Sequence, residues 1–331
     1  MHSYPRSAMA CHARFSCAQT LPSSSLRCNP ANQPGLRSGG VANLGLIRSR
    51  NTVRWGVRAA VSETMGSNET SWVEFPKLSS AGKQLMESVA VMMDRELGAL
   101  IKDSKTPADV RSFQGGTGEG SVTLRAGRLG SKIDLVLGSW LNCSLSFGAL
   151  NIATLIAMMG LTSDAPHLLF EFIQSGPDSL VLVLDLVPRT DLVVDPEYLA
   201  RFYENSGLED IRQTFEKHPQ TQPHRPSALY LRSIVSPTAL LYEISGEGVE
   251  GGLDAVIADL VQPAAVKVVQ TWVKSFKYLG RAMDSDAMAY MKTRDDLIKR
   301  KGVEVDLSAN MPRLFGQEIA DRVVAAFRKG V

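Results

Sequence analysis

The sequence predicts an α+β fold, a three-layer α/β/α sandwich built around a central antiparallel sheet. Candidate strands cluster in the middle of the chain, whereas candidate helices lie at both ends. This order fits an antiparallel sheet covered by helices better than alternating βαβ units. Neither a low-complexity linker nor an internal repeat divides residues 63–331. We therefore expect these residues to form a single domain.

The first expected element is an amphipathic helix at 79–102. Leu85, Val89 and Met92 recur there at helical spacing, and Ser79 or Ser80 can cap its start. A glycine-rich stretch then precedes a run of strands that are rich in aliphatic and aromatic residues and bounded by turn residues. These strands are expected at 121–126, 132–141, 167–174, 179–187, 227–235 and 238–245. A short buried helix is expected between them at 149–161.

Helices are expected to complete the domain. Residues 196–218 predict two short helices between the strands, and longer helices are predicted at 252–279, 285–300 and 317–328. The Ser236-Pro237 pair marks a break between two strands, because proline cannot donate a ladder hydrogen bond.

The first 62 residues have a composition of their own. They contain no Asp or Glu, no Lys, eight Arg and nine Ser, and the first acidic residue is Glu63. Arg- and Ser-rich, acid-poor leaders are typical of organelle import signals, and no secretory apolar core follows Met1. We predict a transit peptide at 1–62, with the chloroplast favoured over the mitochondrion. A disordered basic tail is the alternative.

Removal of this leader changes the chemistry of the chain. It leaves 28 basic against 34 acidic residues, a net charge of −6, and Cys143 as the one remaining cysteine. A single cysteine can form neither an intramolecular disulfide nor a CxxC metal site. No run approaches 18 apolar residues, so no membrane span is expected.

The stretch 246–251 matches the GxGxxG pattern of dinucleotide-binding folds, after a predicted strand and before a predicted helix. Glu247 and Glu250 would place carboxylates where a pyrophosphate should lie. The acidic residue that would bind the ribose is also missing from 260–283. We therefore interpret the stretch as a glycine-rich turn, which argues against NADPH as the direct reductant.

Glu171 is the most unusual charged residue of the predicted strands. It lies in the middle of 168–173, between Phe170 and Phe172. A carboxyl group in such a strand must reach solvent, bind a partner or stay protonated. Periodicity alone favours a surface-facing Glu on a one-sided sheet, and a carboxyl group in a pocket is the alternative.

Several fragments, taken together and in order, resemble the red chlorophyll catabolite reductase family. The resemblance covers roughly residues 71–331. The fragments are DVRSFQ at 109–114, DLVLGSW at 134–140, GALNI at 148–152, SDAP at 163–166, FEFIQSGP at 170–177, LDLVPR at 184–189, LRSIVSPT at 231–238, RDDLIK at 294–299 and MPRLFG at 311–316.

This resemblance implies the fold of ferredoxin-dependent bilin reductases, with the bilin held between the sheet and the C-terminal helices. It implies reduction of one methine-bridge double bond of red chlorophyll catabolite, a linear tetrapyrrole, to give primary fluorescent chlorophyll catabolite during senescence. Electrons would come singly from reduced ferredoxin, with no bound metal or flavin. A homodimer in the chloroplast stroma, the upstream pheophorbide a oxygenase as a partner, and an additional mitochondrial destination complete these expectations.

The resemblance also assigns roles to particular residues. Glu171 and Asp306 match the acids that bind the substrate and donate protons, although Asp306 fits a cap or turn residue equally well. Val235 matches a position that lines the pocket, where side-chain size would bias the face of the bilin that is protonated. His167 and Arg232 are further substrate-binding candidates. Arg232 would bind the propionate, although an outward-facing strand arginine is as probable, and a strand-entry role is the more probable one for His167.

A local basic segment is the candidate docking site for an acidic ferredoxin. Residues 267–301 hold nine basic and four acidic residues, in a mature chain that is otherwise acidic. A solvated helix face is the alternative, and no nucleic-acid recognition module appears. The predicted docking residues are Lys274, Lys277, Arg281, Lys299 and Arg300.

Two other functions fit the same sequence. A non-catalytic tetrapyrrole-binding or scaffold protein would keep the pocket and lose the proton donors, so the presence of Glu171 and Asp306 favours an enzyme. A reductase of another bilin, such as biliverdin, is disfavoured by the fragments above.

Overall fold

The computed structural model describes residues 71–146, 148–302 and 307–329. Residues 1–70 lie outside this part, so the predicted transit peptide and the domain boundary at residue 62 stay predictions. Asp306 also lies outside the described residues, within the segment 303–306.

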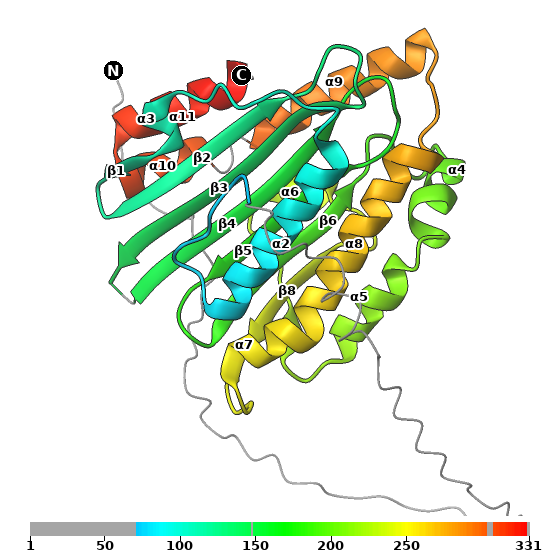
Figure 1. Cartoon of the computed structure of the whole chain (residues 1–331). Helices are drawn as coiled ribbons and strands as arrows, with labels where there is room; N and C mark the ends of the chain where they lie inside the picture. Colours follow the sequence, from blue (N-terminus) through cyan, green and yellow to red (C-terminus); the bar gives the residue numbers. More distant parts are fainter. Residues whose placement is uncertain (1–70, 147, 303–306, 330–331) are drawn as a thin grey trace, which may run out of the picture. The chain divides into compact units, whose positions relative to one another are not determined.

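The described residues form an antiparallel sheet of eight strands, in the order β1-β2-β3-β4-β5-β6-β8-β7 (Figure 1). Every neighbouring pair is antiparallel, which confirms the predicted α+β class. The strands are β1 Phe113–Gly115, β2 Gly118–Ala126, β3 Ile133–Leu145, β4 Gly148–Met159, β5 His167–Gln174, β6 Ser179–Val187, β7 Thr221–Pro223 and β8 Leu240–Ser245.

The two faces of the sheet differ in how tightly they are covered. On the first, which we call the α2 face, Leu168, Phe170 and Phe172 of β5 are completely buried. Because side chains alternate along a strand, Leu169, Glu171 and Ile173 point to the opposite α9 face, and all three are only half-buried. The α9 face is therefore the side on which a ligand can reach the central strands.

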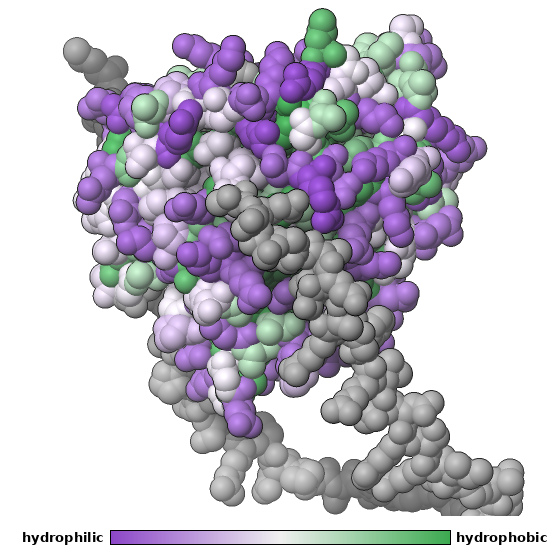
Figure 2. Space-filling model, in the orientation of Figure 1, coloured by the Kyte–Doolittle hydropathy of each residue, from purple (hydrophilic) through white to green (hydrophobic). Residues whose placement is uncertain are grey.

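Helices α2 (Ser80–Leu97), α7 (Gly252–Val256) and α8 (Gln262–Lys274) cover the α2 face, as Figure 1 shows. Leu85, Val89 and Met93 of α2 are completely buried, and each such side chain contributes about 1.5–3 kcal/mol. Ser79 caps α2 by accepting a hydrogen bond from the backbone of Gly82, as the sequence predicted. Outside, hydrophilic residues dominate this side of the molecule (Figure 2).

Five further helical segments lie on the α2 side. Three connect β6 to β7, and the other two directly follow α7 and α8. They are α4 (Pro196–Leu199), the π-helical turn η1 (Ala200–Glu204), α5 (Leu208–Lys217), and the π-helical turns η2 (Ile257–Val261) and η3 (Ser275–Leu279). The helices predicted at 196–218 and 252–279 are thus confirmed.

The α9 face is covered in two parts. Over β1–β3 lie α3 (Ala108–Arg111), α10 (Ser308–Phe315) and α11 (Gln317–Lys329), which enclose a second apolar cluster with Leu124, Leu137 and Phe315. Near β5 and β6 lie α6 (Leu229–Ile234) and α9 (Ser285–Gly302), which touch each other. Helices on both faces complete the predicted three-layer arrangement.

The prediction of a short buried helix at 149–161 is wrong, because these residues form strand β4. This strand pairs along most of its length with both β3 and β5. Ala153, Leu155 and Ala157 face α2, while Ile152 and Ile156 face the other side. A central strand that is apolar on both faces has the same hydrophobic pattern as a buried helix segment.

The strand predicted at 227–235 is also wrong, because Leu229–Ile234 form helix α6. The place beside β8 is taken instead by the short edge strand β7, which ends at Pro223. Leu229 is 74% exposed and Ile234 is 8% exposed, so the segment buries one end of a short helix and does not alternate as a strand would.

The remaining predicted strands are confirmed, and β5 and β6 match their predicted bounds. The helices predicted at 285–300 and 317–328 are confirmed as α9 and α11.

The glycine-rich stretch 246–251 forms the turn between β8 and α7, as the sequence analysis interpreted it. A side chain at Gly246 would lie 2.1 Å from the backbone nitrogen of Leu253, so the strand and the helix meet too closely for any other residue. Strand β8 is antiparallel to β6. This is not the parallel geometry that places a pyrophosphate at a helix start in dinucleotide-binding folds.

Candidate active site on the open face of the sheet

A row of polar side chains crosses the middle of the α9 face. Ser139 of β3 pairs in register with Thr154 of β4, and Thr154 pairs with Glu171 of β5. Neighbouring strands are about 4.8 Å apart, so the three side chains lie next to one another. Glu171 thus ends a short line of hydroxyl groups.

Apolar side chains border this polar row on both sides. One border is formed by Leu137, Ile156 and Leu169, and the other by Leu141, Ile152 and Ile173. Ile152, Ile156, Leu169 and Ile173 are only half-buried. Ser139 and Thr154 are buried, so Glu171 is the most accessible polar residue of the row. A half-buried apolar surface with one such carboxyl group suits a flat, mostly apolar ligand that makes few hydrogen bonds.

Glu171 is half-buried in the centre of this surface. Its neighbour on the other side, Val183 of β6, pairs in turn with Leu241 of β8. The sequence left open whether Glu171 faces solvent on a one-sided sheet or a pocket. The structure places it on the face that carries helices α6 and α9 as well, and its role stays a prediction.

A second carboxyl group, Asp185 of β6, lies on the same face and was missed as a candidate. It is 2% exposed and pairs in register with Leu169. Ser236 donates to it twice, from the backbone nitrogen at 2.8 Å and from Oγ at 2.5 Å. Burial raises the pKa of Asp185 to about 6, despite these hydrogen bonds, which favour the charged form. An aspartate between Leu184 and Leu186 was the available signal.

The Asp185–Ser236 contact fixes the position of Val235. This residue ends helix α6 in an extended conformation and is half-buried. Because Ser236 is bound to Asp185 of β6, Val235 is held close to the α9 face. The geometry is compatible with the predicted pocket-lining role, which stays a prediction.

His167, at the start of β5, belongs to a buried polar network rather than to an open surface. Its Nδ1 accepts a hydrogen bond from the backbone nitrogen of Met159 at 2.9 Å, so Nε2 carries the proton and donates to Asp295 of α9 at 2.9 Å. Burial lowers the pKa of His167, although the hydrogen bond to Asp295 opposes this effect. Neither ring nitrogen is left for a substrate in this structure.

Arg189 completes the network. It is completely buried and binds Asp295 through Nε, at 3.1 Å, and through a terminal nitrogen, at 2.6 Å. It also donates to the backbone oxygens of Gly160 and Ser163. Burial alone would raise the pKa of Asp295. The contacts with His167 and Arg189 outweigh this effect, so the pKa is lowered. The network therefore ties α9 to the ends of β5 and β6.

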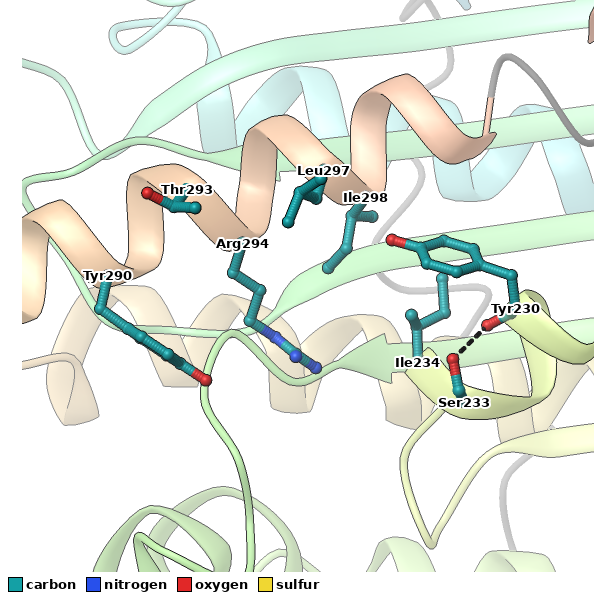
Figure 3. Close-up of a pocket in the computed structure, with 8 residues that line it drawn as sticks. All are labelled: Tyr230, Ser233, Ile234, Tyr290, Thr293, Arg294, Leu297 and Ile298. Atoms are coloured by element: carbon teal, nitrogen blue, oxygen red, sulfur yellow. Dashed lines mark hydrogen bonds between the residues drawn. The ribbon is translucent and has the colours of Figure 1, made fainter.

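A cavity of about 290 Å³ lies between α6 and α9 (Figure 3). Helix α6 contributes one wall and α9 the other. The lining residues are Tyr230, Ser233 and Ile234 of α6 and Tyr290, Thr293, Arg294, Leu297 and Ile298 of α9. Arg294 donates from Nε to the backbone oxygen of Pro188 at 3.1 Å, which fixes its guanidinium group next to the end of β6.

Arg232, the predicted propionate-binding residue, lies on α6 but is exposed and is not among the residues that line this cavity. The strand on which it was expected is a helix, so the predicted strand geometry does not apply. Its role in substrate binding stays a prediction.

The predicted docking cations fall into two groups. Lys274, Lys277 and Arg281 lie on or just after α8 and η3, and Lys277 pairs with Glu96 at 2.5 Å. Lys299 and Arg300 lie at the end of α9, where Lys299 stands over the ring of Phe327 at 5.8 Å. The two groups belong to different helices, but both approach the start of β3, where Lys132 donates to the backbone oxygen of Phe276 and Asp134 pairs with Lys299. The docking role of the five residues stays a prediction.

In the described part of the chain, no three His, Cys, Asp or Glu residues are placed to hold a metal ion. Nor does any helix described there have the length and apolar character needed to cross a membrane.

Comparison with known proteins identifies the family. Residues 81–329 match the family model of red chlorophyll catabolite reductase. The chain belongs to this family. It is 37% identical over 278 residues to red chlorophyll catabolite reductase 1 of Oryza sativa subsp. japonica, covering 82% of this chain and 83% of the relative. It is 36% identical over 265 residues to the Arabidopsis thaliana enzyme, covering 78% and 82%.

A solved structure supports the fold assignment. The chain resembles phytochromobilin synthase from tomato, whose structure contains biliverdin, with a TM-score of 0.58 and 16% sequence identity. The match covers 74% of this chain and 82% of the synthase. The expected bilin reductase-like fold is thus confirmed.

Proposed function

We propose that this protein reduces red chlorophyll catabolite to primary fluorescent chlorophyll catabolite, with electrons from reduced ferredoxin. The observation that carries the proposal is family membership across 81–329. The half-exposed apolar surface around Glu171 supports it, because a linear tetrapyrrole is a long, mostly apolar molecule with polar nitrogens along one edge.

The proposed reaction adds two electrons and two protons across one methine-bridge double bond. Two reduced ferredoxins supply one electron each and are oxidised. Glu171 donates one proton to the reduced bilin, and Asp306 or water supplies the other. A carboxyl group that is half-buried among apolar residues can lie close to the tetrapyrrole and transfer a proton over hydrogen-bond distance. No bound metal or flavin takes part in this scheme.

Val235 is proposed to influence which face of the bilin receives the proton. It follows α6 and is held in place by the contact of Ser236 with Asp185. A larger side chain there would shift the tetrapyrrole relative to Glu171.

The protein is proposed to work in the chloroplast, since the rice and Arabidopsis relatives are both named as chloroplastic. The stroma, an additional mitochondrial destination, a homodimer and an association with pheophorbide a oxygenase are proposals that rest on the family resemblance.

The test is an anaerobic assay of residues 63–331 with red chlorophyll catabolite, with and without reduced ferredoxin. Loss of red absorbance and gain of blue fluorescence only with ferredoxin would support the proposal. Binding without conversion would indicate a carrier, and conversion of biliverdin alone would indicate another bilin reductase. Either result would contradict the proposed function.

A further inference from the structure

Arg294 differs from the other arginines of the described part of the chain. Each of the other buried or half-buried arginines lies within 4 Å of a carboxylate. They are Arg125, Arg189, Arg201, Arg212 and Arg322. Arg294 is also half-buried, yet within the described ranges no carboxylate pairs with it. Its Nε binds the backbone oxygen of Pro188, which leaves the two terminal nitrogens directed into the cavity.

The guanidinium group is fixed in place, and Figure 3 shows it extending from α9 into the opening between α9 and α6. A fixed guanidinium presents two parallel N–H donors, the arrangement that binds a carboxylate in a bidentate manner. The chemistry of this position therefore fits a carboxylate from outside the described chain.

The walls around Arg294 are mostly apolar, although Tyr230, Ser233, Tyr290 and Thr293 bring hydroxyl groups to the lining. Ile234, Leu297 and Ile298 line the cavity, and the side chains of Tyr290 and Leu297 are 49% and 40% exposed at its rim. A free inorganic anion would contact the guanidinium group but bury no apolar surface against these walls. A carboxylate on an apolar body would do both. At about 290 Å³, the cavity fits one arm of a tetrapyrrole rather than the whole molecule.

The cavity lies beside the candidate active site. Arg294 binds the residue that directly follows β6, and the neighbouring Asp295 binds His167 at the start of β5. Glu171 is four residues further along β5, which corresponds to about 13 Å of strand. A tetrapyrrole with its reacting bridge at Glu171 can therefore extend toward Arg294.

We infer that Arg294 binds the propionate of the open-chain tetrapyrrole, in the cavity between α6 and α9, and thereby positions the substrate. This inference rests on the proposed function and assigns the propionate contact to Arg294 rather than to Arg232.

The test compares two ligands, red chlorophyll catabolite and its propionate methyl ester, in anaerobic absorbance titrations without ferredoxin. The wild-type protein is expected to bind the free acid about 10- to 100-fold more tightly than the ester, as one charge-assisted contact provides. Arg294→Gln is expected to bind both ligands with the affinity that the wild type shows for the ester. Arg294→Lys, which keeps the charge, should retain part of the preference.

Arg232→Gln tests the competing assignment, since Arg232 is the exposed cation of α6 that the sequence predicted to bind the propionate. It should retain the full preference for the free acid. The inference is overturned if Arg294→Gln still prefers the acid, if Arg232→Gln loses the preference, or if Arg294→Gln changes only the oligomeric state. Turnover of the free acid by the wild type with reduced ferredoxin separates the two proposals, because it tests the proposed function without depending on Arg294.

Discussion

Glu171 and Asp185 lie on the same face of the sheet, but they differ in how accessible they are. Glu171 is half-buried beside the open apolar surface, whereas Asp185 is enclosed and held by Ser236. The first can meet a substrate directly. The second acts through the chain that it holds, and therefore positions Val235.

Replacement of Glu171 by Gln should lower turnover about 100-fold or more, because a positioned general acid contributes a factor of this size. Substrate affinity should change little, since glutamine has nearly the same shape. Steady-state assays with reduced ferredoxin, together with ligand titrations, measure the two effects separately.

Glu243→Gln is the control for this prediction. Glu243 belongs to β8, and its carboxylate pairs with His224 at 3.0 Å. Its row on the sheet, through Val181 and Ile173, borders the row of Glu171. Near-normal turnover is expected for this variant, and an equal loss in both variants would rule out a specific role for Glu171.

Asp185 should make stability depend on pH. Its folded pKa of about 6 lies above its ordinary value of 3.8, so the folded state keeps a proton that the unfolded chain releases. The contribution of Asp185 to stability is therefore greatest below pH 4 and falls by up to about 3 kcal/mol as the pH rises through about 6. Urea unfolding of wild type and Asp185→Asn across pH 4–7 measures this fall, which the variant should lack. If the free energy of unfolding depended on pH in the same way in both proteins, the predicted effect of Asp185 would be disproved.

At the scale of elements, the position of α9 depends on a few buried polar contacts. Its Asp295 reaches His167 and Arg189, and Arg294 reaches Pro188. These contacts hold the helix at the edge of the open face and so define one wall of the cavity.

Asp295→Ala should destabilise the protein by about 3–5 kcal/mol, because it leaves the buried guanidinium of Arg189 without its carboxylate. Denaturant unfolding measures the loss. Asp296→Ala is a close control, because Asp296 follows Asp295 directly and forms an exposed pair with Lys292. Its loss should have little effect on stability. Equal stabilities for the two variants would show that the buried network does not hold α9.

The errors of sequence analysis occurred where local pattern and tertiary position disagree. Strand β4 is mostly apolar on both faces, because one face packs on α2 and the other belongs to the apolar α9 face, and no periodicity distinguishes it from a buried helix. Helix α6 is short, exposes Leu229 and contacts α9, so its place depends on tertiary contacts that its own pattern does not reveal. Alternation and bounding turns were sufficient for β5 and β6, which have well-defined ends.

Only part of the candidate site could be predicted, because only some of its residues stand out in their local sequence. Glu171 could be found because a carboxylate inside an aromatic strand is unusual. Asp185 carried a similar signal, because it lies between Leu184 and Leu186, but its partner Ser236 is distant in sequence. Arg294 carried no such signal, because its position depends on a contact with Pro188, which is also distant in sequence.

At the scale of the whole molecule, the distribution of charge bears on how ferredoxin would dock. The predicted cations lie in two groups, one on or just after α8 and η3 and the other at the end of α9. Arg300 follows the part of α9 that lines the cavity, whereas Lys274 ends α8 on the other face. A donor of single electrons should dock near the bilin.

Arg300→Glu should therefore raise the KM for ferredoxin several-fold at low salt, with kcat unchanged and a weaker effect at high ionic strength. Lys274→Glu, an exposed charge reversal on the opposite face, should have a smaller effect. Kinetic titrations with ferredoxin at two salt concentrations measure both, and a larger effect of Lys274→Glu would place the docking site over α8.

We expect the tetrapyrrole to bind on the α9 face, between the row that ends in Glu171 and the cavity that contains Arg294. The most direct measurement is a crystal structure of the protein with red chlorophyll catabolite bound. We expect the rings to lie against Ile156, Leu169 and Ile173, with one propionate on Arg294. A tetrapyrrole bound elsewhere, with the α9 face empty, would show that neither Glu171 nor Arg294 binds the substrate.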